Sequence, residues 1–225
     1  MKVKIIISCW PSFLKCSTQG MRASLEILGG SRILEVLDKH GEYNIPGYGF
    51  RNGDIDFVVY PSSHCYLSTS KNNGINSFSG SIKKQQNITD CDFILLMDAD
   101  HSFLPEQINK LLKNDLPIVG GAYKYRHSCL SECYVAGDMR ENGELKDRLH
   151  ISSTGLNKVH WVGGGFVLVK VEVFNKLEFP WFRGGVVDMG DTANELGEDI
   201  GFCLQAMKAN IPVYCDCDCR VGHSR

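Results

Sequence analysis

The sequence lacks both an excess of one charge and a long apolar segment. Its 24 lysine and arginine residues nearly balance 26 aspartate and glutamate residues, and the formal net charge is −2. Binding to nucleic acid phosphates depends on a basic surface, so this balance argues against a nucleic-acid-binding protein. The apolar run at residues 5–7 is too short for a signal sequence or a membrane-spanning helix. We therefore expect a cytoplasmic protein without a membrane-spanning segment.

Linkers rich in proline, serine or charge are also missing, and the sequence shows no repeat and no segment of low complexity. A chain of 225 residues is long enough to bury a sizeable core. A break between independent units would be expected at an exposed, polar linker. We therefore predict one domain that covers residues 1–225.

Four short apolar segments, at residues 3–9, 56–60, 91–97 and 117–123, are rich in β-branched or aromatic residues and end at polar or turn residues. Such segments are typical of buried strands. Between the last two, Pro105 stands where a first helical residue is favoured, and apolar residues then recur at helical spacing, which predicts a helix at 105–113. Alternating strands and helices indicate an α/β fold with a Rossmann-like, mostly parallel central sheet flanked by helices.

The regular alternation breaks in the second half of the chain. The pair Asn142-Gly143 is typical of a tight hairpin turn, which predicts a small antiparallel excursion. Residues 161–170 and 212–221 are predicted as two further strands, and residues 183–196, which lack periodicity, as a mobile loop. A helix before the last strand has one apolar face, formed by Ile200, Cys203, Ala206 and Met207.

Ten cysteines raise the question of disulfides or zinc. Cys215, Cys217 and Cys219 alternate with polar residues and are predicted to share one face of the last strand with Val213 and Val221. Neighbours on that face lie about 6.5–7 Å apart, which disfavours a disulfide within the strand. We interpret these cysteines as small buried side chains in a reducing compartment. As an alternative, Cys129 and Cys133 could form a disulfide or hold a metal.

The sequence Asp98-Ala99-Asp100 follows the apolar strand at 91–97 directly. Ligand sites in open α/β sheets lie at the carboxyl ends of strands, and two carboxylates offer the hard oxygen ligands that suit Mg²⁺ or Mn²⁺. Paired aspartates also cap turns and helices, which is the structural alternative. The position at the end of a buried strand favours a metal site.

Two further features are weaker when each is considered alone. Glu198 and Asp199 stand directly before the last helical pattern, where carboxylates commonly stabilise the first turn of a helix. His223 is a single histidine after the last strand, and such a residue is more often hydrogen-bonded than bound to a metal.

Six segments together are more specific: FILLMDAD at 93–100, IVGGAY at 118–123, WVGGGF at 161–166, PWF at 180–182, GEDIGFC at 197–203 and VGH at 221–223. In this order and spacing they resemble the GT-A glycosyltransferases, in particular the compact enzymes of phages and large viruses. The resemblance covers nearly the whole chain and is weaker in the first ninety residues.

The resemblance implies transfer of a sugar from a nucleotide-diphosphate donor to a glycan or other hydroxyl acceptor. Residues 1–126 would bind the donor, and residues 127–225 would bind the acceptor and carry the catalytic groups. Mn²⁺ or Mg²⁺ would be the cofactor, bound by Asp98, Asp100 and His223. Asp199 would act as general base in a direct displacement that inverts the configuration at the anomeric carbon, and Glu198 is the less favoured candidate for this role.

The donor site implied by the resemblance comprises Ser8, Trp10, Pro11, Lys71, Asn72, Asp98, Ala99 and Asp100. Here Lys71-Asn72 replaces the arginine-asparagine pair usual in the family, so Lys71 is predicted to contact the donor phosphates. The implied acceptor site comprises Gly163, Gly164, Gly165 and Trp181, and the aromatic rings of Trp181 and Phe182 would stack on the acceptor sugar. Core packing remains an alternative for Trp10 and Phe182, and a strand bulge for the three glycines.

Three other classes of protein share part of this pattern. A haloacid-dehalogenase-type phosphohydrolase also uses an Asp-x-Asp with Mg²⁺, but there the motif follows the first strand. A sugar-nucleotide pyrophosphorylase would open with a glycine-rich phosphate loop, which residues 8–11 do not provide. A non-catalytic carbohydrate-binding relic of the GT-A fold would bind its ligand without turnover.

Overall fold

An eight-stranded sheet runs through the computed structural model, which describes residues 1–9, 17–39, 48–63, 67–75, 90–126, 128–188 and 193–224. Its order is β2-β3-β1-β4-β11-β6-β14-β9. Strands β3, β1, β4, β6 and β14 run in one direction, and β2, β11 and β9 run in the other. The strands are β1 Lys2–Cys9, β2 Tyr48–Asn52, β3 Ile55–Ser63, β4 Phe93–Asp98, β6 Ile118–Ala122, β9 Leu156–Val159, β11 Phe166–Lys170 and β14 Val213–Arg220.

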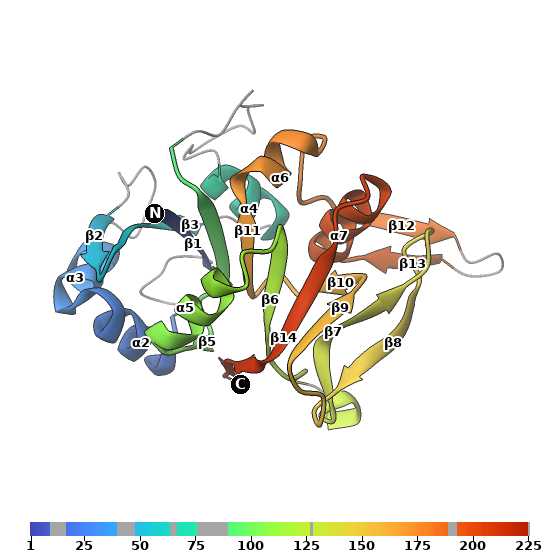
Figure 1. Ribbon diagram of the computed structural model, residues 1–225, viewed down its shortest axis with the longest axis horizontal. Coiled ribbons are helices and arrows are strands. Elements are labelled where there is room, and N and C mark those ends of the chain that lie inside the picture. The colour runs from blue at the N-terminus through green and yellow to red at the C-terminus, as the bar shows by residue number, and fades with distance from the viewer. Residues whose placement is uncertain are drawn as a thin grey trace.

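Helices cover both faces of this sheet (Figure 1). Alternate residues of a strand point to opposite faces, and in β1 the side chains of Ile5 and Ile7 enter one core while Ile6 enters the other. The first core holds α2 Gln19–Gly29, α3 Ser31–Lys39 and α5 Pro105–Lys113, and the second holds α4 Leu67–Ile75, α6 Val171–Lys176 and α7 Glu198–Lys208. The predicted α/β class, with helices on both faces, is confirmed.

The four strands predicted in the first half are confirmed, with ends that differ by at most three residues. The helix predicted at 105–113 is α5, which spans Pro105–Lys113. Its three predicted apolar residues, Ile108, Leu111 and Leu112, are buried.

The predicted antiparallel excursion is a three-stranded sheet of order β10-β7-β8. Strands β7 Cys133–Met139 and β8 Leu145–His150 form its hairpin, and β10 is Trp161–Val162. Gly143 has a φ of +92°, a backbone conformation that glycine adopts without strain, and the Asn142 side chain accepts a hydrogen bond from the Glu144 amide at 3.1 Å. The Asn142-Gly143 turn therefore joins β7 to β8 as predicted.

The prediction of a single strand at 161–170 is wrong. The segment forms two strands in different sheets, β10 and β11, separated by a turn of Gly163, Gly164 and Gly165, which we call the glycine turn. Apolar residues on both sides of the glycines are compatible with one strand or two, so the pattern of hydrophobicity did not show the break.

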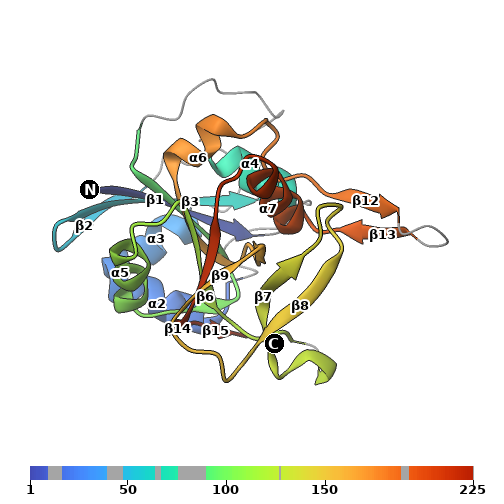
Figure 2. The ribbon, with the colours of Figure 1, turned by 45° about the vertical axis from the view of Figure 1, so that its right-hand side comes forward.

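The loop predicted at 183–196 is also wrong where the structure describes it. Strands β12 Gly185–Asp188 and β13 Ala193–Leu196 pair in antiparallel fashion, with Val186 opposite Glu195. The hairpin projects away from the body of the molecule in two views (Figures 1 and 2).

The three cysteines of β14 do not share one face as predicted. Cys215 and Cys217 pack in the core with α6 and α7, whereas Cys219 packs in the core with α2 and α5. The register of β14 against β6 shifts between Asp216 and Arg220, and such a bulge exchanges the faces of the strand. Among the described residues, Cys129 and Cys133 are free thiols, so the alternative of a disulfide between them is not observed.

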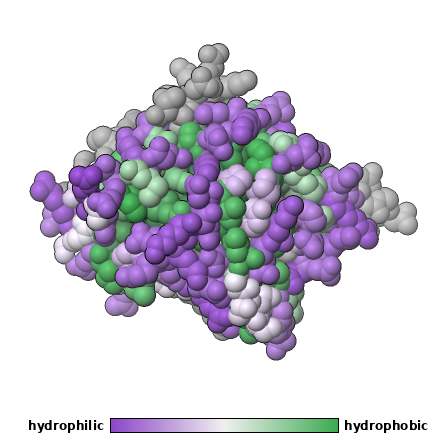
Figure 3. Space-filling model, in the orientation of Figure 1, coloured by the Kyte–Doolittle hydropathy of each residue, from purple (hydrophilic) through white to green (hydrophobic). Residues whose placement is uncertain are grey.

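The face shown in Figure 3 carries hydrophilic residues throughout, with hydrophobic areas between them. Exposed large apolar side chains lie on separate elements, such as Ile27 on α2, Leu156 on β9 and Val186 on β12. None of the helices that the structure describes combines the length and the apolar character needed to cross a bilayer.

Candidate functional site

The aspartates of the Asp98-Ala99-Asp100 sequence lie at the carboxyl end of β4, as predicted. Asp98 is the last residue of β4 and lies beside Ser8 of the parallel strand β1. The Ala99 amide donates a hydrogen bond to the Ser8 carbonyl at 3.1 Å, which joins the two strand ends. Trp10 and Pro11, predicted for the same site, lie outside the described residues.

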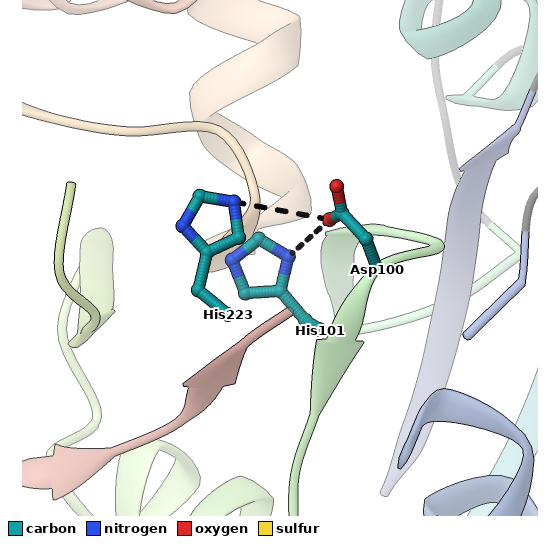
Figure 4. Close-up of side chains that lie close together, drawn as sticks. All are labelled: Asp100, His101 and His223. Carbon is teal, nitrogen blue, oxygen red and sulfur yellow. Dashed lines mark ion pairs between the residues drawn. The ribbon is translucent and has the colours of Figure 1, made fainter. Parts of the chain in front are cut away.

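Two histidines meet Asp100 directly after this strand end. The short strands β5 His101–Ser102 and β15 Gly222–His223 pair in antiparallel fashion, with His101 opposite His223. His101 Nδ1 lies 3.1 Å and His223 Nε2 lies 4.0 Å from Asp100 Oδ1. Figure 4 shows both rings beside one carboxylate oxygen. We call Asp100, His101 and His223 the Asp-His cluster.

Several buried polar atoms around this cluster have no hydrogen-bond partner among the described residues. They are Ser8 Oγ, Asp98 Oδ1, Asp100 Oδ1 and both ring nitrogens of His101. Buried polar groups in folded proteins are usually paired, because leaving one unpaired costs about 1–3 kcal/mol. Such a concentration at a strand end marks a place where a polar ligand or an ion would be stabilised.

The two histidines are in the state that a metal ion requires. Burial lowers the pKa of His101 to about 4, and burial also lowers the pKa of His223. Metal ions bind the neutral imidazole. His223 Nδ1 lies 2.9 Å from the Lys124 carbonyl, which can accept its proton and leave the Nε2 lone pair facing Asp100.

The distances from Asp100 to the two histidines also fit one ion. Nitrogen and oxygen ligands bind small divalent ions at about 2.0–2.2 Å, so two such ligands of one ion are at most about 4.4 Å apart. The separations of 3.1 and 4.0 Å from Asp100 Oδ1 lie within that limit. Among the described residues the potential metal ligands that converge are those of the Asp-His cluster, and Asp98 is not one of them. The structure thus brings together two of the three predicted ligands and adds His101.

Arg126 occupies the other side of the same carboxylate. Its guanidinium forms an ion pair with Asp100 Oδ2, and its side chain is 44% exposed. A ligand that approaches the Asp-His cluster from solvent can therefore reach this cation.

The glycine turn lies next to the cluster, and each of its amides has a partner. The Gly163 amide donates to the Val135 carbonyl at 2.8 Å, and the Gly165 amide donates to the Tyr123 hydroxyl at 3.0 Å. The Gly164 amide donates to Asp199 Oδ2 at 3.3 Å. The turn therefore connects the strand ends of the sheet with the start of α7.

Side chains fill the space where a Cβ atom would stand on each glycine. A Cβ on Gly164 would overlap the Lys71 ammonium, and one on Gly165 would overlap the His101 ring. A Cβ on Gly163 would overlap the Tyr123 hydroxyl. The glycines are thus needed for close packing of buried polar residues, whatever they contact in a substrate.

The acidic pair Glu198 and Asp199 forms the first turn of α7. Glu198 Oε1 accepts a hydrogen bond from the Lys71 ammonium at 2.9 Å, and Asp199 Oδ1 accepts one from the Ile200 amide at 2.8 Å. The predicted helix-start position is confirmed. The pair lies beside the glycine turn, so it is not merely an exposed cap.

Lys71 and Asn72, predicted for the donor site, are buried on α4, with Lys71 1% exposed. Asn72 donates to the Phe182 carbonyl at 2.7 Å and accepts from the Phe182 amide at 3.2 Å. The Lys71 ammonium faces Glu198. Its predicted contact with donor phosphates stays a prediction.

Trp181, predicted for the acceptor site, is 2% exposed. Its indole N–H donates to the Phe174 carbonyl at 2.8 Å, and its ring contacts those of Phe174 and Phe179 edge-on. Phe182 stacks on Phe202 with centroids 4.6 Å apart. Both residues lie in the core, which for Phe182 is the alternative left open from the sequence.

Sequence reasoning missed His101, Tyr123 and Arg126. His101 follows the second aspartate directly, and a histidine next to a carboxylate at a strand end was a usable signal. The direction of its side chain depends on the turn at residues 99–100 and on pairing with β15, which the local sequence does not specify.

No protein-family model matches the sequence, and no curated protein matches it. Among solved structures, the chain is similar to A197 from STIV, with a TM-score of 0.54 and 15% identity, over 96% of this chain and 81% of that chain. It is also similar to GalNAc-T7, solved with UDP, GalNAc and Mn²⁺, with a TM-score of 0.49 and 12% identity. That alignment covers 100% of this chain and 44% of the GalNAc-T7 chain, so this chain spans less than half of that length. The fold class expected from the sequence is confirmed, and a likeness at these identities concerns the fold alone.

Proposed function

We propose that the chain is a metal-dependent GT-A glycosyltransferase that moves a sugar from a nucleotide-diphosphate donor to a hydroxyl group of a glycan or another acceptor. The observation that carries this proposal is the arrangement of two groups about the glycine turn. The Asp-His cluster lies against it through His101, and Asp199 is bonded to it at the Gly164 amide. A site for an ion and a carboxylate that can accept a proton are thus held by one short segment.

Asp100, His101 and His223 would hold the cofactor in this proposal. A divalent ion bound there would stabilise the negative charge that develops on the departing nucleotide diphosphate. Of the two predicted ions, Mn²⁺ suits the cluster better than Mg²⁺, because Mg²⁺ prefers oxygen ligands and keeps its waters, whereas imidazole binds transition metals.

The donor would lie over residues 1–126 at the carboxyl ends of β1 and β4. Asp98 would contact the donor ribose, next to Ser8 and Ala99, because its side chain is partly exposed at the end of β4. Arg126 would contribute a positive charge for the diphosphate, because its side chain is accessible and already paired with a carboxylate of the site.

The acceptor would lie over residues 127–225, beside the glycine turn. Asp199 would take the proton of the acceptor hydroxyl while the hydroxyl oxygen forms the new bond to the anomeric carbon. The bond between that carbon and the diphosphate oxygen breaks in the same displacement, so the configuration inverts. Burial raises the pKa of Asp199, which moves its basicity closer to that of a useful proton acceptor at neutral pH.

A screen of nucleotide sugars tests the proposal. Thermal unfolding would be measured with each nucleotide sugar, with and without Mn²⁺, because a ligand at 100 times its Kd stabilises the folded state by about 2.7 kcal/mol. Binders would then be assayed for sugar transfer to glycans. We expect stabilisation that requires Mn²⁺ and is lost in Asp100→Asn, with Asp138→Asn, a partly exposed carboxylate on β7, as control.

Two results would replace the proposal. Release of phosphate from a generic phosphomonoester, without sugar transfer, would indicate a phosphohydrolase. Metal-dependent binding of a nucleotide sugar without hydrolysis or transfer would indicate a non-catalytic relic of the fold.

A further inference from the structure

Lys71 is a charged residue enclosed in the protein. Its side chain is 1% exposed, and its ammonium lies 5.7 Å from the centroid of the Phe182 ring. The ammonium also packs so closely against Gly164 that a Cβ atom on that residue would overlap it. A buried ammonium is costly unless carboxylates compensate its charge. Glu198 provides this compensation at 2.9 Å, across 127 residues of sequence.

The neighbouring residue fixes the position of that ammonium. Asn72 holds the Phe182 backbone through both of its side-chain groups, at 2.7 and 3.2 Å. These bonds tie α4 to the segment that leads into β12 and α7. Lys71 is thereby placed between the glycine turn and the acidic pair by groups that are themselves buried.

We infer that Lys71 is a positioning residue for the acidic pair, which holds Glu198 in place and keeps Asp199 ionised as proton acceptor. The inference rests on the proposed function, because it gives Asp199 the role of base. In this inference the Lys71 ammonium interacts with carboxylates inside the protein, and other groups contact the donor phosphates.

The charges around Asp199 support this role. Burial raises the pKa of Asp199, the Lys71 ammonium opposes that increase, and the negative charge of Glu198 adds to it. Burial alone would also raise the pKa of Glu198, but Lys71 outweighs it, and the pKa of Glu198 lies below its ordinary value. Glu198 is therefore ionised at neutral pH, and Lys71 is the favourable charge that stabilises ionised Asp199.

Other titratable groups near Asp199 do not change this balance at neutral pH. Burial raises the pKa values of Tyr123, Tyr125 and Cys203, so all three are neutral. Burial disfavours the charged form of Lys71, but the charges of Asp98, Glu198 and Asp199 outweigh it and hold the pKa of Lys71 above its ordinary value. The ammonium consequently stays charged.

Two substitutions should move the titration of Asp199 in opposite directions. Lys71→Met removes the positive charge at similar volume and should raise the pKa of Asp199. Glu198→Gln removes the neighbouring negative charge, keeps an oxygen for Lys71, and should lower it. We expect each shift to reach about one pKa unit, since charged neighbours shift carboxyl groups by about 1–3 units. The titration would be followed by NMR of ¹³C-labelled carboxyl groups.

Kinetics provide a second readout. With the donor and acceptor found in the screen, the acid limb of kcat/KM against pH should move to higher pH in Lys71→Met and to lower pH in Glu198→Gln. Lys71→Arg, which retains the charge, should stay close to the wild type. Lys208→Met, an exposed lysine at the end of α7, is the matched control. A purely structural role would lower the rate without moving the limb.

An unchanged or lowered pKa of Asp199 in Lys71→Met overturns the inference. If Lys71→Met does not fold, Glu198→Gln decides alone, and an unchanged titration of Asp199 there overturns it. If Lys71→Met binds the donor more weakly and the pKa of Asp199 is unchanged, the result would indicate that Lys71 contacts the donor phosphates. Absence of sugar transfer in the wild type would reject the proposed function, whereas the NMR titration would still decide whether Lys71 sets the charge of Asp199.

Discussion

The rings of His101 and His223 stack with centroids 4.5 Å apart and planes inclined by 15°, and both nitrogens of His101 are buried without a hydrogen-bond partner among the described residues. Two neutral imidazoles beside the Asp100 carboxylate give a candidate ligand set with more nitrogen than an Asp-x-Asp sequence suggests. This arrangement leads to the first prediction.

Single substitutions in the Asp-His cluster should weaken Mn²⁺ binding. Asp100→Asn, His101→Phe and His223→Phe should each lower the affinity by more than about tenfold, because loss of an outer-shell partner alone costs about 10–100-fold. The free Mn²⁺ signal in electron paramagnetic resonance measures this affinity. Asp98→Asn distinguishes the ligands predicted from the sequence from the Asp-His cluster. Unchanged affinity would place Asp98 outside the ligand set, and unchanged affinity in His101→Phe would remove His101 from it.

Arg126→Met should have effects of opposite sign on two ligands. Without the guanidinium, Asp100 no longer has a competing partner, so Mn²⁺ alone should bind more tightly. A nucleoside diphosphate with Mn²⁺ should bind more weakly, because a cation near its phosphates is lost. Isothermal titration calorimetry measures both affinities.

Lys124→Met is the control for this pair of measurements, since its exposed side chain lies two residues away on the same segment. A change of the same sign for both ligands in Arg126→Met would mean that Arg126 supports the fold of the site and does not exchange between Asp100 and a phosphate.

Asp199→Asn should abolish most sugar transfer and leave donor binding nearly unchanged. General base catalysis contributes about 10²–10⁴-fold, and ground-state donor contacts do not involve this carboxylate in our proposal. Glu198→Gln should retain transfer, which tests the choice between the two acids. Near-normal transfer in Asp199→Asn together with loss of transfer in Glu198→Gln would reverse their roles, and loss of metal-dependent donor binding in both would assign the pair to the donor site.

As the pH is lowered, kcat/KM of the wild type should begin to fall at a higher pH than it would if the proton acceptor had the pKa of an ordinary aspartate. In the proposed mechanism Asp199 accepts a proton when it is ionised, and its pKa is raised, first by burial. Transfer is therefore fully available above that pKa and is lost as the pH falls through it. A profile of kcat/KM against pH shows the position of this limb, and a limb at the ordinary aspartate value would contradict the assignment.

Gly164→Ala should lower both stability and transfer. The added methyl group would overlap the Lys71 ammonium and come within 3.4 Å of the Asp199 Cβ. Overpacking costs about 1–3 kcal/mol, which lowers the Tm of a protein of this size by roughly 2–12 °C. Gly49→Ala is the control, because its Cβ would meet nothing closer than the Phe57 carbonyl at 3.9 Å, and its Tm should stay near that of the wild type.

Local patterns predicted the regular part of the molecule. The strand at 91–97 and the helix at 105–113 were identified because a buried strand is an apolar run and an amphipathic helix repeats with its own period. Asp98 and Asp100 were predicted to line a ligand site because they follow a strand directly and ligands bind at the carboxyl ends of strands. These inferences need no knowledge of distant contacts.

The remaining errors come from contacts between distant parts of the chain. The glycine turn divides one apolar segment because β10 pairs with β7 and β11 with β4. The hairpin of β12 and β13 is held by pairing between strands that have no clear alternation of their own. The ion pair between Lys71 and Glu198 likewise joins two separate helices, so the local sequence did not indicate it.

The bulge of β14 places Cys219 in the first core, with α2 and α5, although Cys215 and Cys217 pack in the second. Three residues, Cys217, Asp218 and Cys219, lie between Asp216 and Arg220, where the adjacent residues Gly121 and Ala122 of β6 have none between them. The Asp216 carboxylate closes this excursion by accepting bonds from the Asp218 and Cys219 amides at 3.0 and 3.2 Å.

Because side chains alternate along a strand, an odd number of extra residues reverses which side of the sheet every later residue faces. The position of the His223 side chain beside Asp100 therefore depends on the number of residues in the β14 bulge as well as on the histidine itself. Insertion or deletion of a single residue between Asp216 and Arg220 would leave His223 in the sequence and turn its imidazole away from the cluster, so length at this position is under the same constraint as the histidine itself.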